Sequence, residues 1–212
     1  MKTDELISLL ATNAGPAVQV AKPRLLTALA GGMAVALAVV VAFIGVRSDI
    51  ESALWVPMFW VKLGFPLSLV AVAFAASHRL ARPGVALGRL PAALLAPVLV
   101  MWLLAAIEMA GASDAERVGL LFGSSWKECL ALVSLLSIPV FGGTFWAMRG
   151  LAPTRPALAG AAAGLLAGAT GAATYALHCP EMAAPFLGVW YLFAMVIPAV
   201  AGAIGGSFVL RW

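Results

Sequence analysis

Residues 157–177 read ALAGAAAGLLAGATGAATYAL, an uncharged stretch made almost entirely of Ala and Gly. A helix of about 20 apolar residues is long enough to cross the hydrocarbon core of a bilayer. Gly160, Gly164 and Gly168 recur at every fourth position, and such a doubled GxxxG pattern lets a second helix approach closely. The segment therefore predicts a membrane helix that packs tightly within the chain. A homodimer formed through the same glycine face is the alternative.

The rest of the chain is equally apolar. Of its 212 residues, 63% are hydrophobic and 10% are charged, and the mean hydropathy is +1.04. A soluble domain of this length cannot bury so much apolar surface. Six stretches are long and apolar enough to span a bilayer: residues 25–46, 55–77, 91–110, 128–148, 157–177 and 185–210. We predict an all-α, polytopic membrane protein with short loops, divided into a tail (1–24) and a six-helix transmembrane domain (25–212).

The basic residues predict the orientation of these spans, because Lys and Arg of short loops are retained in the cytoplasm. With the N-terminus inside, nine basic residues are cytoplasmic: Lys2, Lys22, Arg24, Arg79, Arg82, Arg89, Arg149, Arg155 and Arg211. Three fall outside: Arg47, Arg117 and Lys127. Both termini are therefore expected in the cytoplasm. The net charge of +4 is explained by this topology and does not indicate nucleic-acid binding.

The tail contains a short amphipathic pattern. Acidic residues occupy its first turn, and leucines follow at the i, i+3, i+4 spacing of one helix face. A helix this short is marginal in water, so a partner groove or the membrane surface would stabilise it. The acidic turn favours a basic protein partner over anionic lipid, while a frayed interfacial leader is the alternative. The predicted partner-binding residues are Asp4, Glu5, Leu6, Ile7, Leu9 and Leu10.

One basic residue lies within a span. Lys62 is about two turns from the outer end of the second span, and a charge at this depth is a functional candidate. Its ammonium group is expected either to reach outward to the interface or to pair with an acid such as Glu108, near the outer end of the third span.

The two cysteines lie in two short motifs. GSSWKEC (123–129) stands at the entry to the fourth span, and HCPE (178–181) at the exit of the fifth. Adjacent antiparallel helices joined by a short inner turn bring such ends together. Cys129 and Cys179 are therefore expected at one water-facing, extracytoplasmic edge of the bundle.

Two thiols at such an edge suit sensing chemistry. They can form a disulfide in an oxidising compartment, or bind a soft or borderline metal ion with neighbouring donors. Lys127 and the helix N-terminus would favour the thiolate of Cys129. However, a single Cys at a helix end is usually inert, and neither motif has CxxC or HxxxH spacing. No cofactor is expected to be obligatory. The predicted sensor residues are Cys129 and Cys179, and the predicted metal donors add His178, Glu128 and Glu181.

The sequence resembles a known family. MKTDELI (1–7), the six spans, GSSWKEC (123–129) and LHCPE (177–181) are similar to the NrsF-type membrane anti-sigma factors of proteobacteria. The resemblance covers essentially the whole chain, and its cysteine motifs are the specific part. It implies an inner-membrane protein that sequesters an extracytoplasmic-function sigma factor. It also implies that heavy metal or oxidative stress acts through the two cysteines to release that partner.

Other classes of function fit less well. No phosphate-binding glycine loop follows a strand, and no Ser, His and acid set shares a face, so enzymatic catalysis is not expected. A small transporter or metal-handling permease would suit Lys62 and the outer donor cluster, but the spans hold almost no other ionisable group. A thiol-disulfide oxidoreductase working with quinone would need a resolving thiol supplied by the fold.

Overall fold

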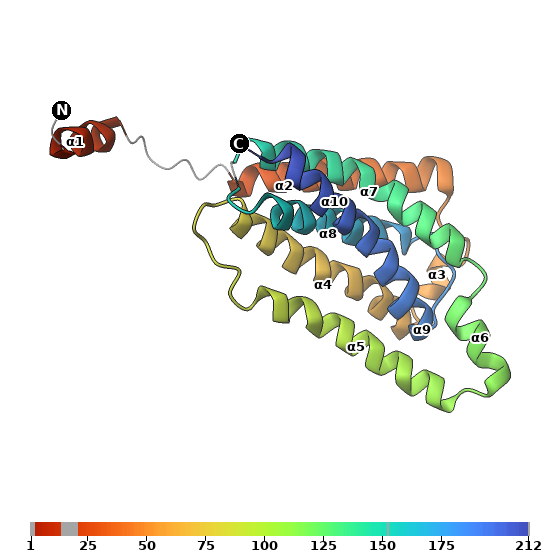
Figure 1. Ribbon diagram of the computed structural model, residues 1–212. Helices are drawn as coiled ribbons and strands as arrows, with labels where there is room; N and C mark the ends of the chain where they lie inside the picture. Colours follow the sequence, from red (N-terminus) through yellow and green to blue (C-terminus); the bar gives the residue numbers. More distant parts are fainter. Residues whose placement is uncertain (1–2, 14–20, 152, 212) are drawn as a thin grey trace.

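The computed structural model describes residues 3–13, 21–151 and 153–211, and every secondary-structure element in these ranges is helical (Figure 1). The long helices are α2 (Ala21–Val39), α4 (Pro57–Leu80), α5 (Leu90–Gly111), α7 (Trp126–Arg149), α8 (Pro156–Tyr175) and α10 (Leu192–Val209). The short ones are α1 (Thr3–Asn13), α3 (Ile50–Ala53), α6 (Asp114–Phe122) and α9 (Ala184–Phe186). Two π-helical segments, η1 (Val40–Ile44) and η2 (Leu187–Tyr191), extend α2 and connect α9 to α10.

The six predicted spans are confirmed as six helices that are long and apolar enough to cross a membrane. Successive long helices reverse direction, so the start of α2 and the end of α10 lie at the same end of the bundle (Figure 1). We call this the basic end, since it carries most of the Lys and Arg residues. The opposite end, formed by residues 45–56, 111–129 and 176–191, is the cysteine end. Helices α3, α6 and α9 lie there and were not predicted from the sequence.

Helix α8, the Ala- and Gly-rich segment, is the central helix. In its most apolar window 78% of the residues are buried, against 6% in α5. It packs against α10, α7 and α4, while α2 packs mainly against α7 and also touches α8 and α4, and α5 lies at the periphery against α4 (Figure 1). Small side chains allow this placement, because each neighbouring backbone can approach α8 closely.

The predicted glycine face of α8 is used within the chain. A Cβ atom at Gly160 would overlap the carbonyl oxygen of Gly202 in α10, and one at Gly164 would overlap that of Pro198. The contact is reciprocal, since a Cβ atom at Gly202 would overlap the carbonyl oxygen of Gly160. This face is therefore occupied by α10 and is not available to a second copy of the chain.

Replacing Gly160 with Ala should destabilise the bundle. The added methyl group must separate two backbones in contact, and overpacking of this kind typically costs about 1–3 kcal/mol. Gly142→Ala in α7 is the matched control, because nothing lies within 4 Å of its Cβ position. The better helix propensity of Ala should leave that variant neutral or up to about 1 kcal/mol more stable. Unfolding titrations in mixed micelles measure both, and equal stability of the two variants would contradict the assigned interface.

Candidate functional site

The cysteine end holds the two predicted sensor residues in one buried cluster. Cys129 lies in the first turn of α7, and Cys179 follows the C-terminal end of α8. Both thiols are free, both residues are 0% exposed, and both belong to the same hydrophobic core. The fold thus brings the cysteines into one cluster, as expected. The expectation that they face water is wrong, because the protein covers them completely.

Two tyrosines complete this cluster. Tyr175 ends α8 and Tyr191 ends η2, and their ring centroids are 6.0 Å apart. Both hydroxyl groups are buried beside the Cys179 thiol, and neither has a partner of good hydrogen-bond geometry among the described residues. Buried hydroxyl groups normally have a hydrogen-bond partner, so these two unpaired hydroxyl groups are an unfavourable feature of an otherwise apolar core. We refer to Cys129, Cys179, Tyr175 and Tyr191 as the cysteine cluster.

Lys62 of α4 is tied to the same place. Its side chain is fully buried, and its Nζ atom donates hydrogen bonds to the carbonyl oxygens of Cys179 at 2.5 Å and Glu181 at 2.8 Å. The Nζ atom also lies 5.9 Å from the ring centroid of Tyr191. The expected pairing with Glu108 is therefore wrong, and the ammonium group extends instead to backbone carbonyls of the loop at the cysteine end, where the protein encloses it. The Glu108 carboxylate accepts a hydrogen bond from the backbone nitrogen of Ala184 at 2.8 Å instead.

Lys62 holds residues 177–181 (LHCPE). We call these five residues the HCPE segment. Arg47 binds it twice, through its backbone nitrogen to the Leu177 carbonyl at 3.1 Å and through its guanidinium to the Cys179 carbonyl at 3.3 Å. The Nδ1 atom of His178 lies 2.8 Å from the carbonyl oxygen of Gly45. Five contacts thus fix a short irregular segment that carries one of the two buried thiols.

Arg47 is itself fixed by Asp49. The guanidinium donates two hydrogen bonds to the carboxylate, at 2.6 and 2.7 Å. These hydrogen bonds lower the pKa of Asp49 below its ordinary value and raise that of Arg47. A carboxylate with a lowered pKa keeps its ion pair at neutral pH and loses it only as the pH falls through that lowered value. Sequence reasoning assigned Arg47 only a topological role and missed this function.

The two cysteine motifs are bonded to one another. The Glu181 carboxylate accepts hydrogen bonds from the backbone nitrogen of Ser124 at 2.7 Å and from its hydroxyl at 2.8 Å. Gly123 has a positive φ of 54°, and a Cβ atom there would lie 2.7 Å from that carboxylate. Both the positive φ and the lack of room for a Cβ atom require glycine at this position. The turn that begins α7 and the segment that follows α8 are therefore joined by direct hydrogen bonds.

The predicted metal donors do not assemble. In the described part of the chain no group of three or more His, Cys, Asp and Glu side chains is placed to hold a metal ion. Glu128 is exposed, and Glu181 and His178 are engaged in the contacts given above. Lys127, expected beside the Cys129 thiol, lies over the ring of Trp126 at 5.3 Å from the centroid. The geometry does not support a preformed metal site at this end.

The predicted partner-binding residues lie on α1, which stands apart from the bundle in Figure 1. Asp4 and Glu5 are in its first turn and are exposed, and Ile7 is 58% exposed. The side chains of Leu6, Leu9 and Leu10 lie outside the described part of the chain, so the proposed apolar face is represented by Ile7 alone.

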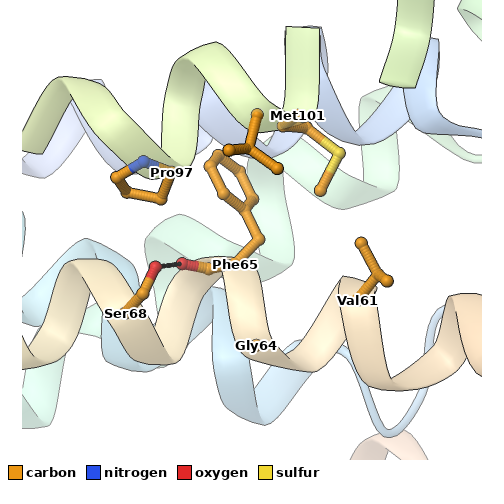
Figure 2. A pocket seen from close by; sticks show the side chains of 7 residues that line it. Val61, Gly64, Phe65, Ser68, Pro97 and Met101 are labelled. Carbon is orange, nitrogen blue, oxygen red and sulfur yellow. Dashed lines mark hydrogen bonds between the residues drawn. The ribbon is translucent and has the colours of Figure 1, made fainter. Parts of the chain in front are cut away.

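A second candidate site is a pocket of about 260 Å³ between α4 and α5. Figure 2 shows Pro97 and Met101 of α5 facing Phe65 and Ser68 of α4. The Ser68 hydroxyl is already bonded to the Phe65 carbonyl at 2.6 Å. The pocket is lined by Val61, Gly64, Phe65, Ser68, Pro97, Val100 and Met101. With no ionisable side chain, it lacks the groups that a transport pathway for ions requires.

Comparison with known proteins identifies the family. The chain matches the NrsF family, described as negative regulator of sigma F, over residues 10–212. The chain belongs to the NrsF family. It is 50% identical over 214 residues to the "Probable anti-sigma-F factor NrsF" of Azospira oryzae and 39% identical over 215 residues to the "Anti-sigma-F factor NrsF" of Caulobacter vibrioides. Both alignments cover 100% of each chain. No solved structure is significantly similar.

Lys62→Met should expose Cys179 to reagents from solution. The variant leaves two carbonyl groups at the HCPE segment without their donor, and an unmade buried hydrogen bond costs about 1–3 kcal/mol. The segment should therefore open at least about tenfold more often. Maleimide labelling of the detergent-solubilised protein measures this: the wild-type thiols should react only after denaturation. Lys127→Met, which removes an exposed lysine, is the control, and equally slow labelling of both variants would contradict the holding role of Lys62.

Proposed function

We propose that this NrsF family member is a membrane-bound anti-sigma factor of the bacterial inner membrane. It sequesters an extracytoplasmic-function sigma factor and releases it when chemistry occurs at the cysteine cluster. The observation that carries the proposal is the family match over residues 10–212, supported by two full-length relatives named as anti-sigma-F factors. A family of negative regulators also favours this role over a transporter or an oxidoreductase.

The sigma factor would bind at α1. In the proposed topology α1 is cytoplasmic, and it presents exposed acids and an exposed isoleucine. The connections at the basic end are too short to offer a comparable surface. An isolated helix of 11 residues is marginal in water, and burial of its apolar face on a partner would stabilise it. Holding the sigma factor at the membrane by this helix keeps it from core RNA polymerase.

Ile7→Asp should weaken retention of the sigma factor at least tenfold, because a charge then occupies the apolar face. Deletion of residues 2–12 should abolish it. Val118→Asp in α6 is the matched control: Val118 is 65% exposed on another short amphipathic helix, at the opposite end of the bundle. Pull-down of the co-expressed sigma factor by the tagged membrane protein measures retention. Unchanged recovery with the deletion variant would refute α1 as the docking site.

The trigger would act on the two thiols. A two-electron oxidant can accept two electrons and two protons from Cys129 and Cys179 and leave a disulfide, or a thiophilic metal ion can displace the two thiol protons. A disulfide requires the two Cα atoms to come within about 7 Å. Either product ties the start of α7 to the HCPE segment covalently or by coordination. The shift of α7 against α8 would then bias the bundle toward a state that releases the partner.

The free energy that such a switch needs depends on how strongly the resting state is favoured. Moving a two-state equilibrium from 1:99 to 99:1 takes about 5.5 kcal/mol of differential stabilisation. A disulfide typically contributes roughly 2–4 kcal/mol. A contribution of that size suffices where the resting state is favoured less strongly than 99:1.

Cys129→Ala and Cys179→Ala should each abolish release under stress while leaving retention intact. Either change removes one half of the disulfide or of the metal site. Val133→Ala, one turn further along α7 and equally buried, controls for loss of packing and should respond normally. The measurement is transcription from a sigma-dependent promoter after addition of peroxide or a thiophilic metal ion. A full response in both cysteine variants would refute the sensor role and leave the anti-sigma role untouched.

A further inference from the structure

The basic end of the bundle contains a cavity that the anti-sigma role does not use. It has a volume of about 300 Å³ and is lined by Arg24, Trp146, Arg149 and Gly150. We propose that this cavity binds the phosphate group of an anionic phospholipid. The inference goes beyond the proposed function, and neither depends on the other.

The cavity is built where two helices end side by side. Arg24 lies in the first turn of α2, Arg149 is the last residue of α7, and these helices pack against each other. A Cβ atom at Gly150 would lie 2.5 Å from the Nη1 atom of Arg24, so the absence of a side chain lets that guanidinium sit over the end of α7. Two guanidinium groups from neighbouring helices are thereby brought to one cavity.

These two guanidinium groups have no acidic partner in the described ranges of the chain. The ion pairs found there are Arg47–Asp49 and Arg117–Asp114, both at the cysteine end. Neither Arg24 nor Arg149 has a side-chain hydrogen bond to another described residue. Guanidinium groups bind phosphate oxygens through paired, charge-assisted hydrogen bonds. A converging pair without an internal anion therefore fits an external one.

The position of the cavity favours a lipid as the source of that phosphate. It opens at the first turn of one apolar span and the last turn of another, which is the depth of the headgroups when the bundle crosses a bilayer. Trp146 is 71% exposed there, and tryptophan is typical of the membrane interface. Below it, Val35 of α2 and Ile138 of α7 are 50% and 60% exposed and offer apolar surface for acyl chains. A pocket between helices with this lining is the kind that binds acidic lipid headgroups.

Lipid titration of the purified full-length chain tests the proposal. Thermal unfolding in mild detergent is followed as short-chain phosphatidylglycerol, phosphatidylcholine or inorganic phosphate is added at constant ionic strength. The variants are Arg24→Gln, Arg149→Gln and the corresponding lysine substitutions, which keep the charge but lose the planar fork. Arg89→Gln is the matched control, because Arg89 is an exposed arginine at the same end outside the cavity.

We expect phosphatidylglycerol to raise the unfolding temperature at concentrations at least tenfold lower than phosphatidylcholine, with no shift from millimolar inorganic phosphate. Each glutamine variant should weaken apparent binding about fivefold, lysine variants less, and Arg89→Gln less than twofold. Three results would each overturn the proposal: equal response to phosphatidylcholine, an equal shift from inorganic phosphate, or equal weakening by Arg89→Gln. If a glutamine variant does not fold, the corresponding lysine variant tests the proposal. Phosphatidylglycerol binding by that lysine variant equal to wild-type binding would refute recognition by the arginine forks.

Discussion

The backbone contact between α8 and α10 is the constraint on which the rest of the bundle depends. Lipid tails are as apolar as leucine, so membrane helices associate through close packing more than through removal of apolar surface from water. Gly160, Gly164 and Gly202 supply that close packing. With α10 in direct contact on one side, α8 can also pack against α7 and α4. The end of α8 then lies beside the start of α7, and this position brings Cys179 into the same core as Cys129.

The same arrangement turns the cysteine end into a mechanically connected unit. Lys62 joins α4 to the HCPE segment, and Glu181 joins that segment to the turn before α7. A buried lysine without a carboxylate is costly, and here hydrogen bonds to two backbone carbonyl groups offset part of that cost. Any displacement of the HCPE segment must therefore strain or break contacts with α4 and with the turn before α7. In the proposed function, a local chemical event at this segment would act through these contacts on helices that run the length of the bundle.

Hydropathy and glycine spacing predicted the fold well because both express constraints that act along a single helix. The six spans and the glycine face of α8 are of this kind. The environment of Lys62 is different, because its acceptors are carbonyl oxygens 117 and 119 residues away, and no residue type marks a backbone acceptor in a sequence. The burial of Cys129 and Cys179 was missed for a related reason. Hydropathy locates helix ends, but it does not tell whether a following segment folds back over them.

Burial changes how a thiol pair can respond to its surroundings. An exposed thiolate reacts at a rate fixed by its own nucleophilicity, whereas a covered thiol reacts only in the fraction of molecules whose cover has opened. Cys179 belongs to the HCPE segment, and displacement of that segment is opposed by Lys62, Arg47 and His178. The sensitivity of the proposed switch is therefore set by the local stability of that segment more than by the acidity of either thiol. Weaker contacts would lower the threshold for release, and stronger contacts would protect the thiols from brief exposure to oxidant.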